Sequence, residues 1–181
     1  GDIPSENGII LWDDTNGYPV VSKNGEFRQI VLEDGHYNGG IASSVTAAAI
    51  NTAYALTYTP SLQDGITNGT PASRLVVEEA GYYQISFSAQ IRSTSSSSVK
   101  FYFWPRVNGT DVAGATMINT LHSNGASLVT GRTAAFEFAA GDYIEAMWAV
   151  DGSSGFLEAA AATAFAPAAP ASTISIVRLH G

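Results

Sequence analysis

The sequence predicts an all-β protein: a jelly-roll β-sandwich of about eight antiparallel strands, preceded by a small N-terminal β-hairpin module. Two observations favour this fold class. Apolar and polar residues alternate with a period of two, most clearly in YYQISFSAQIRS (residues 82–93), and Gly, Asn and Ser turns separate such segments. No helical period persists over the length that a stable helix needs.

Residues 1–40 are predicted to form the N-terminal module. They hold short apolar strands and two turn signals, Asn16-Gly17 and Asn24-Gly25, which favour small hairpins. Such a ribbon has too little core to be stable alone. Residues 41–46, in a stretch rich in Gly and Ser, are interpreted as a linker, and residues 47–181 as the jelly-roll domain.

Beyond the linker the chain is a series of predicted strands. They are AAAINTAYALTYT (47–59), SRLVVEEAG (73–81), YYQISFSAQIRS (82–93), VKFYFWPRV (99–107), TDVAGATMI (110–118), LVTGRTAAFEF (128–138), YIEAMWAV (143–150) and STISIVRLHG (172–181). In the third, Tyr83, Ile85, Phe87, Ala89 and Ile91 are expected to face the core. The Ala-rich stretch 156–165 has helical propensity, but its place among strands predicts an extended edge or loop.

Length and composition narrow the classes of function. With 181 residues the chain suits one large domain with a small appendage. It has no cysteine, which excludes thiol catalysis and thiolate metal sites. Neither a signal peptide nor 18 consecutive apolar residues are present, and we expect a soluble, whole gene product.

The charge pattern argues against two kinds of partner. The net charge is −8, and the eight Lys and Arg residues are scattered, so neither nucleic acid nor a membrane is an expected partner. Charged residues make up 13% of the chain, which is about half the usual share in globular domains. So low a share suggests that copies of the same chain cover much of the surface.

A search for chemistry yields no catalytic, cofactor-binding or metal-binding residues, and no cofactor is expected. His36, His122 and His180 stand in separate segments without a metal-binding spacing, which is typical of surface histidines. There is no GxSxG elbow and no phosphate-binding loop. Asn68-Gly69-Thr70 and Asn108-Gly109-Thr110 match the glycosylation sequon, but both are more simply tight turns.

The segment FYFWPRVNGTDVAG (101–114) presents aromatic residues on two faces of one predicted strand. Phe101 and Phe103 share one face, and Tyr102 and Trp104 share the other. One face should meet the core. For the second, a subunit contact through Tyr102 and Trp104 is our prediction, with core packing and a sugar-binding platform as the alternatives.

The order of several short motifs resembles a known family. They are aGxYxixFsa at 80–89, vNG at 107–109, aaGDyiexxW at 139–148 and a last strand that follows Pro167 and Pro170. Together they resemble the jelly-roll domains at the ends of phage virion proteins, which are similar to the trimeric tumour-necrosis-factor and complement-head folds. The N-terminal region also resembles short hairpin modules of phage fibre and decoration proteins.

The resemblance implies a non-enzymatic structural protein of the phage virion surface, made in the host cytoplasm. We expect a homotrimeric capsid decoration, or cement, protein whose N-terminal module binds the major capsid protein. The expected anchoring residues are Ile9, Ile10, Leu11, Trp12, Tyr18 and Phe27. One alternative is a fibre tip that reads a receptor or host surface glycan, and another is a carbohydrate-binding module or carbohydrate-active enzyme.

Overall fold

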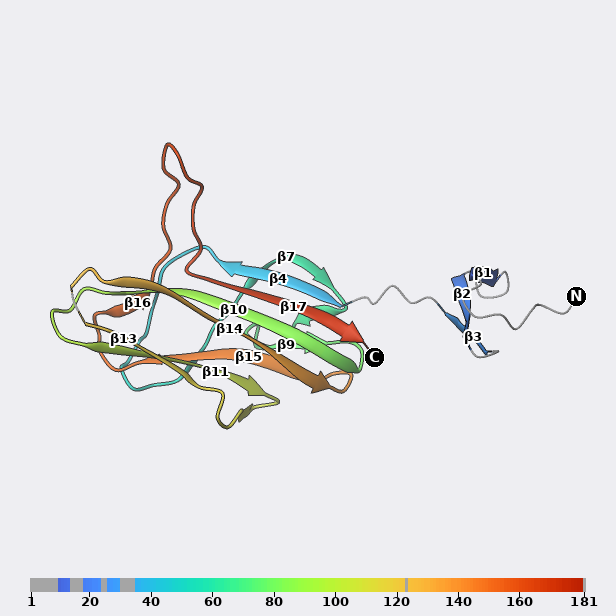
Figure 1. The fold of residues 1–181 in the computed structure, drawn as a ribbon. Coiled ribbons are helices and arrows are strands. Elements are labelled where there is room, and N and C mark those ends of the chain that lie inside the picture. Colours follow the sequence, from blue (N-terminus) through green and yellow to red (C-terminus); the bar gives the residue numbers. More distant parts are fainter. Residues whose placement is uncertain (1–9, 14–17, 24–25, 30–34, 123, 181) are drawn as a thin grey trace, which may run out of the picture. The chain divides into compact units, whose positions relative to one another are not determined.

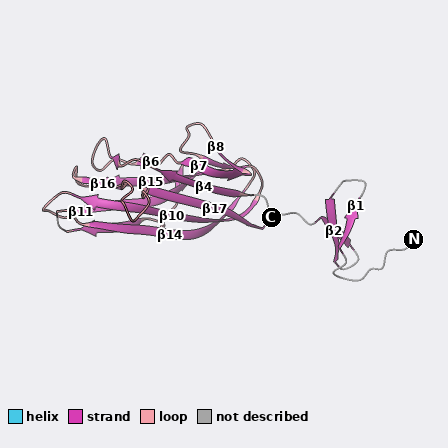
Figure 2. Cartoon of the chain, turned by 90° about the horizontal axis from the view of Figure 1, so that it is seen from above, coloured by secondary structure: helices cyan, strands magenta, loops and turns pink. Residues whose placement is uncertain are grey.

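The computed structural model describes residues 10–13, 18–23, 26–29, 35–122 and 124–180, and the chain divides into two compact units. The first is Gly1–Asp34, and the second, called the head from here on, is Gly35–Gly181. No helix occurs among the described residues (Figure 2), and so none with the length and apolarity that crossing a bilayer requires.

The N-terminal unit contains one antiparallel sheet. Its strands are β1 (Ile10–Asp13), β2 (Tyr18–Lys23) and β3 (Glu26–Gln29), in that order. The two predicted Asn-Gly turns, at 16–17 and 24–25, lie outside the described residues.

The head is a sandwich of two antiparallel sheets (Figure 1). Sheet B consists of β4 (His36–Ile41), β5 (Val45–Thr46), β7 (Thr59–Asp64), β10 (Gly81–Ser93), β14 (Ser127–Phe138), β16 (Gly155–Leu157) and β17 (Ser172–His180). Sheet C consists of β6 (Tyr54–Ala55), β8 (Ile66–Asn68), β9 (Leu75–Val77), β11 (Val99–Val107), β12 (Thr110–Asp111), β13 (Met117–Leu121) and β15 (Tyr143–Val150). The predicted class, an all-β jelly roll, is confirmed.

The long strand β10 organises sheet B. Along one side it pairs with β14, and along the other it pairs first with β17 and then with the short β16. From β17 the sheet continues to β4 and then to β7. The order across the sheet is therefore β14, β10, β17, β4, β7, and β14 forms an edge.

Alternation in β10 divides its residues between the core and the opposite face as predicted. Tyr83, Ile85, Ala89 and Ile91 are buried, and Phe87 is partly buried against the same core. From sheet C, Phe101, Phe103 and Trp148 meet them and are almost completely buried. Burial of one large side chain contributes about 1.5–3 kcal/mol, so this cluster is the main source of stability in the head.

The hairpin after β11 confirms the predicted turn. Val107 pairs with Thr110, which leaves Asn108 and Gly109 as a two-residue loop. Their φ angles are 47° and 80°, and Asn and Gly are the residues that most readily adopt positive φ.

The boundary between the two units differs from the predicted one. Residues 36–41, assigned from the sequence to the end of the module and the start of the linker, form β4 between β17 and β7. Tyr37 is fully buried, and a Cβ on Gly39 would lie 2.8 Å from the Tyr37 ring. The glycine there permits close packing, whereas its sequence context indicated a flexible linker. The units consequently divide after Asp34.

Candidate functional site

The surface of sheet B that faces away from the core carries uncharged residues from five adjacent strands, most of them small, with the larger Leu62 at one end. The strand register aligns them in two rows, one of Leu62, Asn38, Ser175, Ser86 and Thr133, and one of Thr59, Gly40, Thr173, Ser88 and Gly131. These ten residues are called the outer face of sheet B. Charged groups are absent from both rows.

Four of the six hydroxyl groups of the outer face form two pairs across strands. The Ser86 and Thr133 hydroxyls are 3.0 Å apart, and those of Ser88 and Thr173 are 2.7 Å apart. A hydroxyl that already has a protein partner loses less free energy when water is removed than an unpaired one. The outer face is therefore uncharged, made mostly of small side chains, and inexpensive to desolvate.

A hollow of about 620 Å³ lies over part of this face. Its lining includes Asn38, Thr59, Ser86, Ser88, Thr173 and Pro170. A surface with such a depression can receive a protruding part of another molecule.

Two consecutive hydrogen bonds inside the sandwich support the strands of the outer face. The Tyr58 hydroxyl is 3.0 Å from the Ser172 hydroxyl, which in turn donates to the backbone carbonyl of Ser88 at 2.7 Å. Burial raises the pKa of Tyr58, and the hydrogen bond with Ser172 offsets part of that effect. The phenol consequently stays neutral and holds β17 and β10 in register.

A second hollow opens between the two sheets beside the edge strand β14. It has a volume of about 240 Å³ and is lined by core-facing side chains of both sheets, among them Phe87, Phe103, Ala134, Phe136 and Ile144. The segment between β12 and β13, residues 112–116, borders it, and Ala113 in that segment is exposed. This hollow, called the β14 cavity, is mostly apolar.

Residues 158–171, between β16 and β17, form an arm that stands out from the head (Figure 1). Its two legs are tied by reciprocal backbone hydrogen bonds of 2.9 Å between Ala160 and Ala169. At the tip, the backbone N–H of Thr163 donates to the carbonyl of Ala166, and the N–H of Ala166 donates to the Thr163 hydroxyl at 3.0 Å. The extended conformation predicted for the Ala-rich stretch is confirmed, and Phe165 at its tip is 91% exposed.

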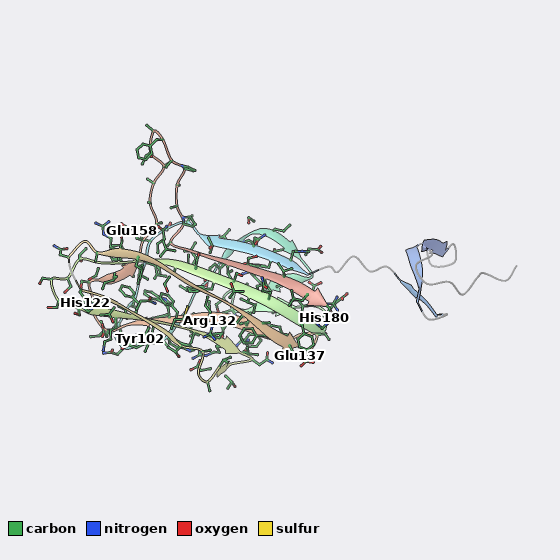
Figure 3. The ribbon with its side chains drawn as sticks, viewed as in Figure 1. Tyr102, His122, Arg132, Glu137, Glu158 and His180 are labelled. Carbon is green, nitrogen blue, oxygen red and sulfur yellow. The ribbon has the colours of Figure 1, made fainter. Side chains whose placement is uncertain are left out.

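The arm is anchored at its base. Glu158, its one charged residue, pairs with Arg92, and Figure 3 shows Glu158 where the arm leaves the sheet. Its backbone N–H donates to the carbonyl of Gln90, and Ala171 at the other end of the arm is fully buried. The legs are thus fixed while the tip has no cover from the described residues of its own chain.

Tyr102 and Trp104 lie on the opposite side of the sandwich, on the face of sheet C away from the core (Figure 3 labels Tyr102). Both side chains are partly buried. The Trp104 indole N–H donates to Asp111 Oδ1 at 2.8 Å, and Arg106 Nε donates to the same oxygen at 2.7 Å. The Arg106 bond, with help from the Trp104 bond, lowers the pKa of Asp111, so its carboxylate stays charged and pins the hairpin. The predicted subunit contact through Tyr102 and Trp104 stays a prediction.

The remaining predicted residues are spread over the chain. Ile10, Leu11 and Trp12 belong to β1, Tyr18 to β2 and Phe27 to β3, whereas Ile9 lies outside the described residues. Among the histidines, His122 and His180 are exposed at opposite ends of the head (Figure 3), and His36 is on β4. No group of three or more potential metal-ligating side chains occurs among the described residues.

The outer face and the arm were not singled out from the sequence. Alternation in β10 does place Gln84, Ser86, Ser88 and Gln90 on the outward face. The other four strands that complete the face are distant in sequence, and their register decides which of their residues join it.

Comparison with known proteins supports the fold. No family model matches the chain, and no curated protein matches it in sequence. Among solved structures, the head is similar to the structure of Eiger TNF from S. frugiperda, with a TM-score of 0.55 and 12% sequence identity, over 81% of this chain and 93% of that one. At this identity the likeness shows the fold alone: the chain contains a TNF-like jelly roll.

Proposed function

We propose that this chain is a non-enzymatic structural protein of a phage-type virion surface, a homotrimer that decorates the capsid. The heads associate through the outer face of sheet B, and the N-terminal unit attaches each chain to the major capsid protein. The observation that carries the proposal is the outer face itself: two rows of uncharged, mostly small side chains across five strands.

A monomeric protein in water has no need of such a face. Its sheets usually carry Lys, Glu, Asp or Arg on the solvated side, because charges keep the surface soluble. The cores of subunit interfaces, by contrast, are depleted of charge. The paired hydroxyls of Ser86 with Thr133 and Ser88 with Thr173 lower the cost of desolvation further. A copy of the same chain is the simplest cover, because closed symmetric assemblies are the commonest oligomers.

Attachment by three N-terminal units suits a decoration protein. Each unit is a compact part of the chain that contains a small three-stranded sheet. Once one unit is bound, the other two bind at high effective concentration, so modest single contacts add up to tight attachment. The virion assignment rests on the resemblance carried by the order of motifs from aGxY to GDyiexxW along the chain.

The trimer is tested by introducing a charge at the centre of the outer face. Ser88→Arg removes the Ser88–Thr173 hydroxyl pair and places a guanidinium group in a dry contact, where an unpaired charge is costly. We expect the wild type to sediment as a trimer at micromolar concentration and the variant as a monomer with an unchanged circular dichroism spectrum.

The matched control, Tyr102→Ala, alters the other face of the sandwich. If the interface lies on the outer face of sheet B, this variant stays trimeric. Loss of the trimer in Tyr102→Ala but not in Ser88→Arg would move the interface to the Tyr102 and Trp104 side. A monomeric wild type would refute the oligomer altogether.

Attachment to the particle is tested in the full chain with Trp12→Ala and Phe27→Ala together. The reagent is capsid of the virus that encodes the chain, stripped of this protein. We expect the wild type to cosediment with the capsids and the double variant to remain in the supernatant as a trimer. A double variant that still decorates capsids would refute the anchoring role, and a glycan array that responds to the wild type but not to Trp104→Ala would favour the receptor-binding alternative.

A further inference from the structure

We propose that Phe165, at the tip of the arm, docks into the β14 cavity of a neighbouring copy of the same chain. This inference rests on the proposed homotrimer and adds to it a second, interlocking contact. It assigns a role to the Ala-rich arm and to the cavity together.

The arm has the properties of a preformed knob. Backbone hydrogen bonds between Ala160 and Ala169 and the turn closed by Thr163 hold it in one conformation. Between Glu158 at its base and Ser172 the sequence carries no charge. Phe165 is 91% exposed at the end of a hydrogen-bonded hairpin, so its burial against a partner surface would stabilise an assembly at little cost in flexibility.

The β14 cavity has the properties of the matching hole. The aromatic rings of Phe87, Phe103 and Phe136 line it together with small Ala134. It opens beside β14 because this strand is the edge of sheet B and pairs, among the described strands, with β10. Arg132 Nη1 donates to the carbonyl of Ala115 at 3.0 Å, which ties β14 to the segment that borders the cavity.

The two features agree in size. The cavity measures about 240 Å³. Apolar protein cavities of roughly 150 Å³ take up benzene, so a phenyl ring fits here with room for part of its backbone. Aromatic pairs gain additional energy from tilted and edge-to-face contacts, and Phe87 and Phe103 already lie in a tilted arrangement, with ring centroids 5.3 Å apart.

The occupant must come from another copy. Figure 1 shows the arm directed away from β11 and β15, whereas the cavity lies between the sheets, so Phe165 cannot enter the cavity of its own chain. From the Ala160–Ala169 bridge to the tip is about five residues of extended chain, which gives a reach of about 16 Å beyond the bridge. Every copy carries one knob and one hole, so head-to-tail docking closes a ring in which each arm is buried once.

The arm leaves the head beside the proposed interface. Pro170, at its base, lines the hollow over the outer face of sheet B. A neighbour seated on that face therefore lies within reach of the arm.

The chain has no cysteine, which permits a direct test by disulfide trapping in the full-length protein. Ala164→Cys, which leaves Phe165 in place, puts one thiol at the tip, and Ala113→Cys puts one at the border of the cavity. When the two single variants are co-expressed and oxidised, we expect a covalent dimer that joins one chain of each kind, because a disulfide requires Cα atoms within about 7 Å. The double variant should form covalent trimers.

Each single variant is the control for the other and should remain monomeric on a non-reducing gel. Disulfides between two Ala164→Cys chains would show that the tips meet one another. A disulfide within one chain of the double variant would place the tip in its own cavity. Either result overturns the proposal. A wild type that sediments as a monomer would refute the proposed function, whereas a trimer in which the two introduced thiols do not link refutes the arm contact alone.

A second measurement uses affinity. Burial of one phenylalanine corresponds to about a 10- to 100-fold change in an equilibrium constant, so Phe165→Ala should raise the trimer dissociation constant at least that much. The matched control is Ile118→Ala, which removes another exposed apolar side chain, 60% exposed, outside the arm. Equal dissociation constants for the two variants would show that Phe165 is not buried on assembly.

Discussion

Asn68 offers a sharp test of the head's internal architecture, because its side chain makes four hydrogen bonds that join separate segments. Its Oδ1 accepts from the Tyr37 hydroxyl and from Gln63 Nε2, both at 3.1 Å. Its Nδ2 donates to the carbonyls of Ala72 at 2.7 Å and Tyr58 at 3.2 Å. The asparagine side chain of this sequon is thus engaged in hydrogen bonds within the head. The variant Asn68→Ala removes all four of them.

The expected loss follows from these contacts. Each hydrogen bond contributes about 0.5–1.5 kcal/mol, with the exposed bond from Gln63 at the low end. The Tyr37 hydroxyl, on a fully buried residue, would retain a contact of 3.4 Å to the Tyr58 carbonyl, and a poorly paired buried hydroxyl costs about 1–3 kcal/mol. Because some of these losses overlap, we expect destabilisation of about 2–4 kcal/mol, which corresponds to a fall in Tm of about 6–12 °C for a domain of this size.

Urea denaturation followed by tyrosine and tryptophan fluorescence measures this loss. Thr67→Ala is the matched control, because Thr67 is the exposed neighbour of Asn68 on β8 and should change stability by less than about 0.5 kcal/mol. Equal free energies of unfolding for the two variants would refute the reasoning.

Asn68→Asp separates the accepting from the donating role. It keeps an acceptor for Tyr37 but turns a donor that faces the Ala72 and Tyr58 carbonyls into an acceptor. The folded state then disfavours the ionised carboxyl and raises its pKa above the unfolded value of about 3.9. The deficit of this variant should therefore be smaller near pH 4 and grow as the pH rises; a pH-independent deficit would contradict the donor role.

Two further predictions concern sheet B. Burial raises the pKa of Tyr58, so the contribution of its neutral phenol to stability is complete below the unfolded pKa near 10 and is lost above it at up to about 1.4 kcal/mol per pH unit. Tyr58→Phe should therefore flatten the decline in unfolding free energy between about pH 10 and 12. An unchanged slope would contradict a neutral buried phenol. A Cβ on Gly131 would lie 2.5 Å from the Phe87 carbonyl oxygen, so Gly131→Ala should force β14 away from β10 and cost about 1–3 kcal/mol; an unchanged urea midpoint would show that β14 adjusts freely.

Local patterns predicted the long strands β10, β11, β14, β15 and β17, whereas the predicted strand 47–59 contains in full only the short β6, and the strands β5, β7, β8 and β16 were not predicted. The faces of β10, the Asn108-Gly109 turn and the extended Ala-rich stretch could all be inferred from neighbouring residues. Strand β4 could not be inferred in this way, because the glycines of HYNGGI locally indicate a flexible segment. Gly39 instead allows close contact with the Tyr37 ring, and that contact depends on tertiary packing. β15 also departs from simple alternation: Glu145 is buried because Ser73, distant in sequence, donates to its Oε1 at 2.7 Å.

The candidate site was less predictable than the fold for a related reason. The outward position of Ser86 and Ser88 follows from alternation in β10, but a patch arises only when β17 brings Thr173 beside Ser88 and β14 brings Thr133 beside Ser86. These pairs are separated by 85 and 47 residues along the chain. Short-range patterns carry no information about such register.

The distribution of charge connects the face, the arm and the composition of the chain. In the head, Arg92 pairs with Glu158 at the foot of the arm, Arg178 with Glu79, and Arg106 with Asp111 in the β11–β12 hairpin. None of these pairs lies in the two rows of the outer face, and none lies on the arm beyond its base. Charged residues are thus not distributed evenly over the head. They are absent from the outer face and from the arm beyond its base, where we propose that neighbouring copies meet. In a free monomer, charges there would cost nothing in packing and would improve solubility, so their absence is best explained by surfaces that are covered in the assembled protein.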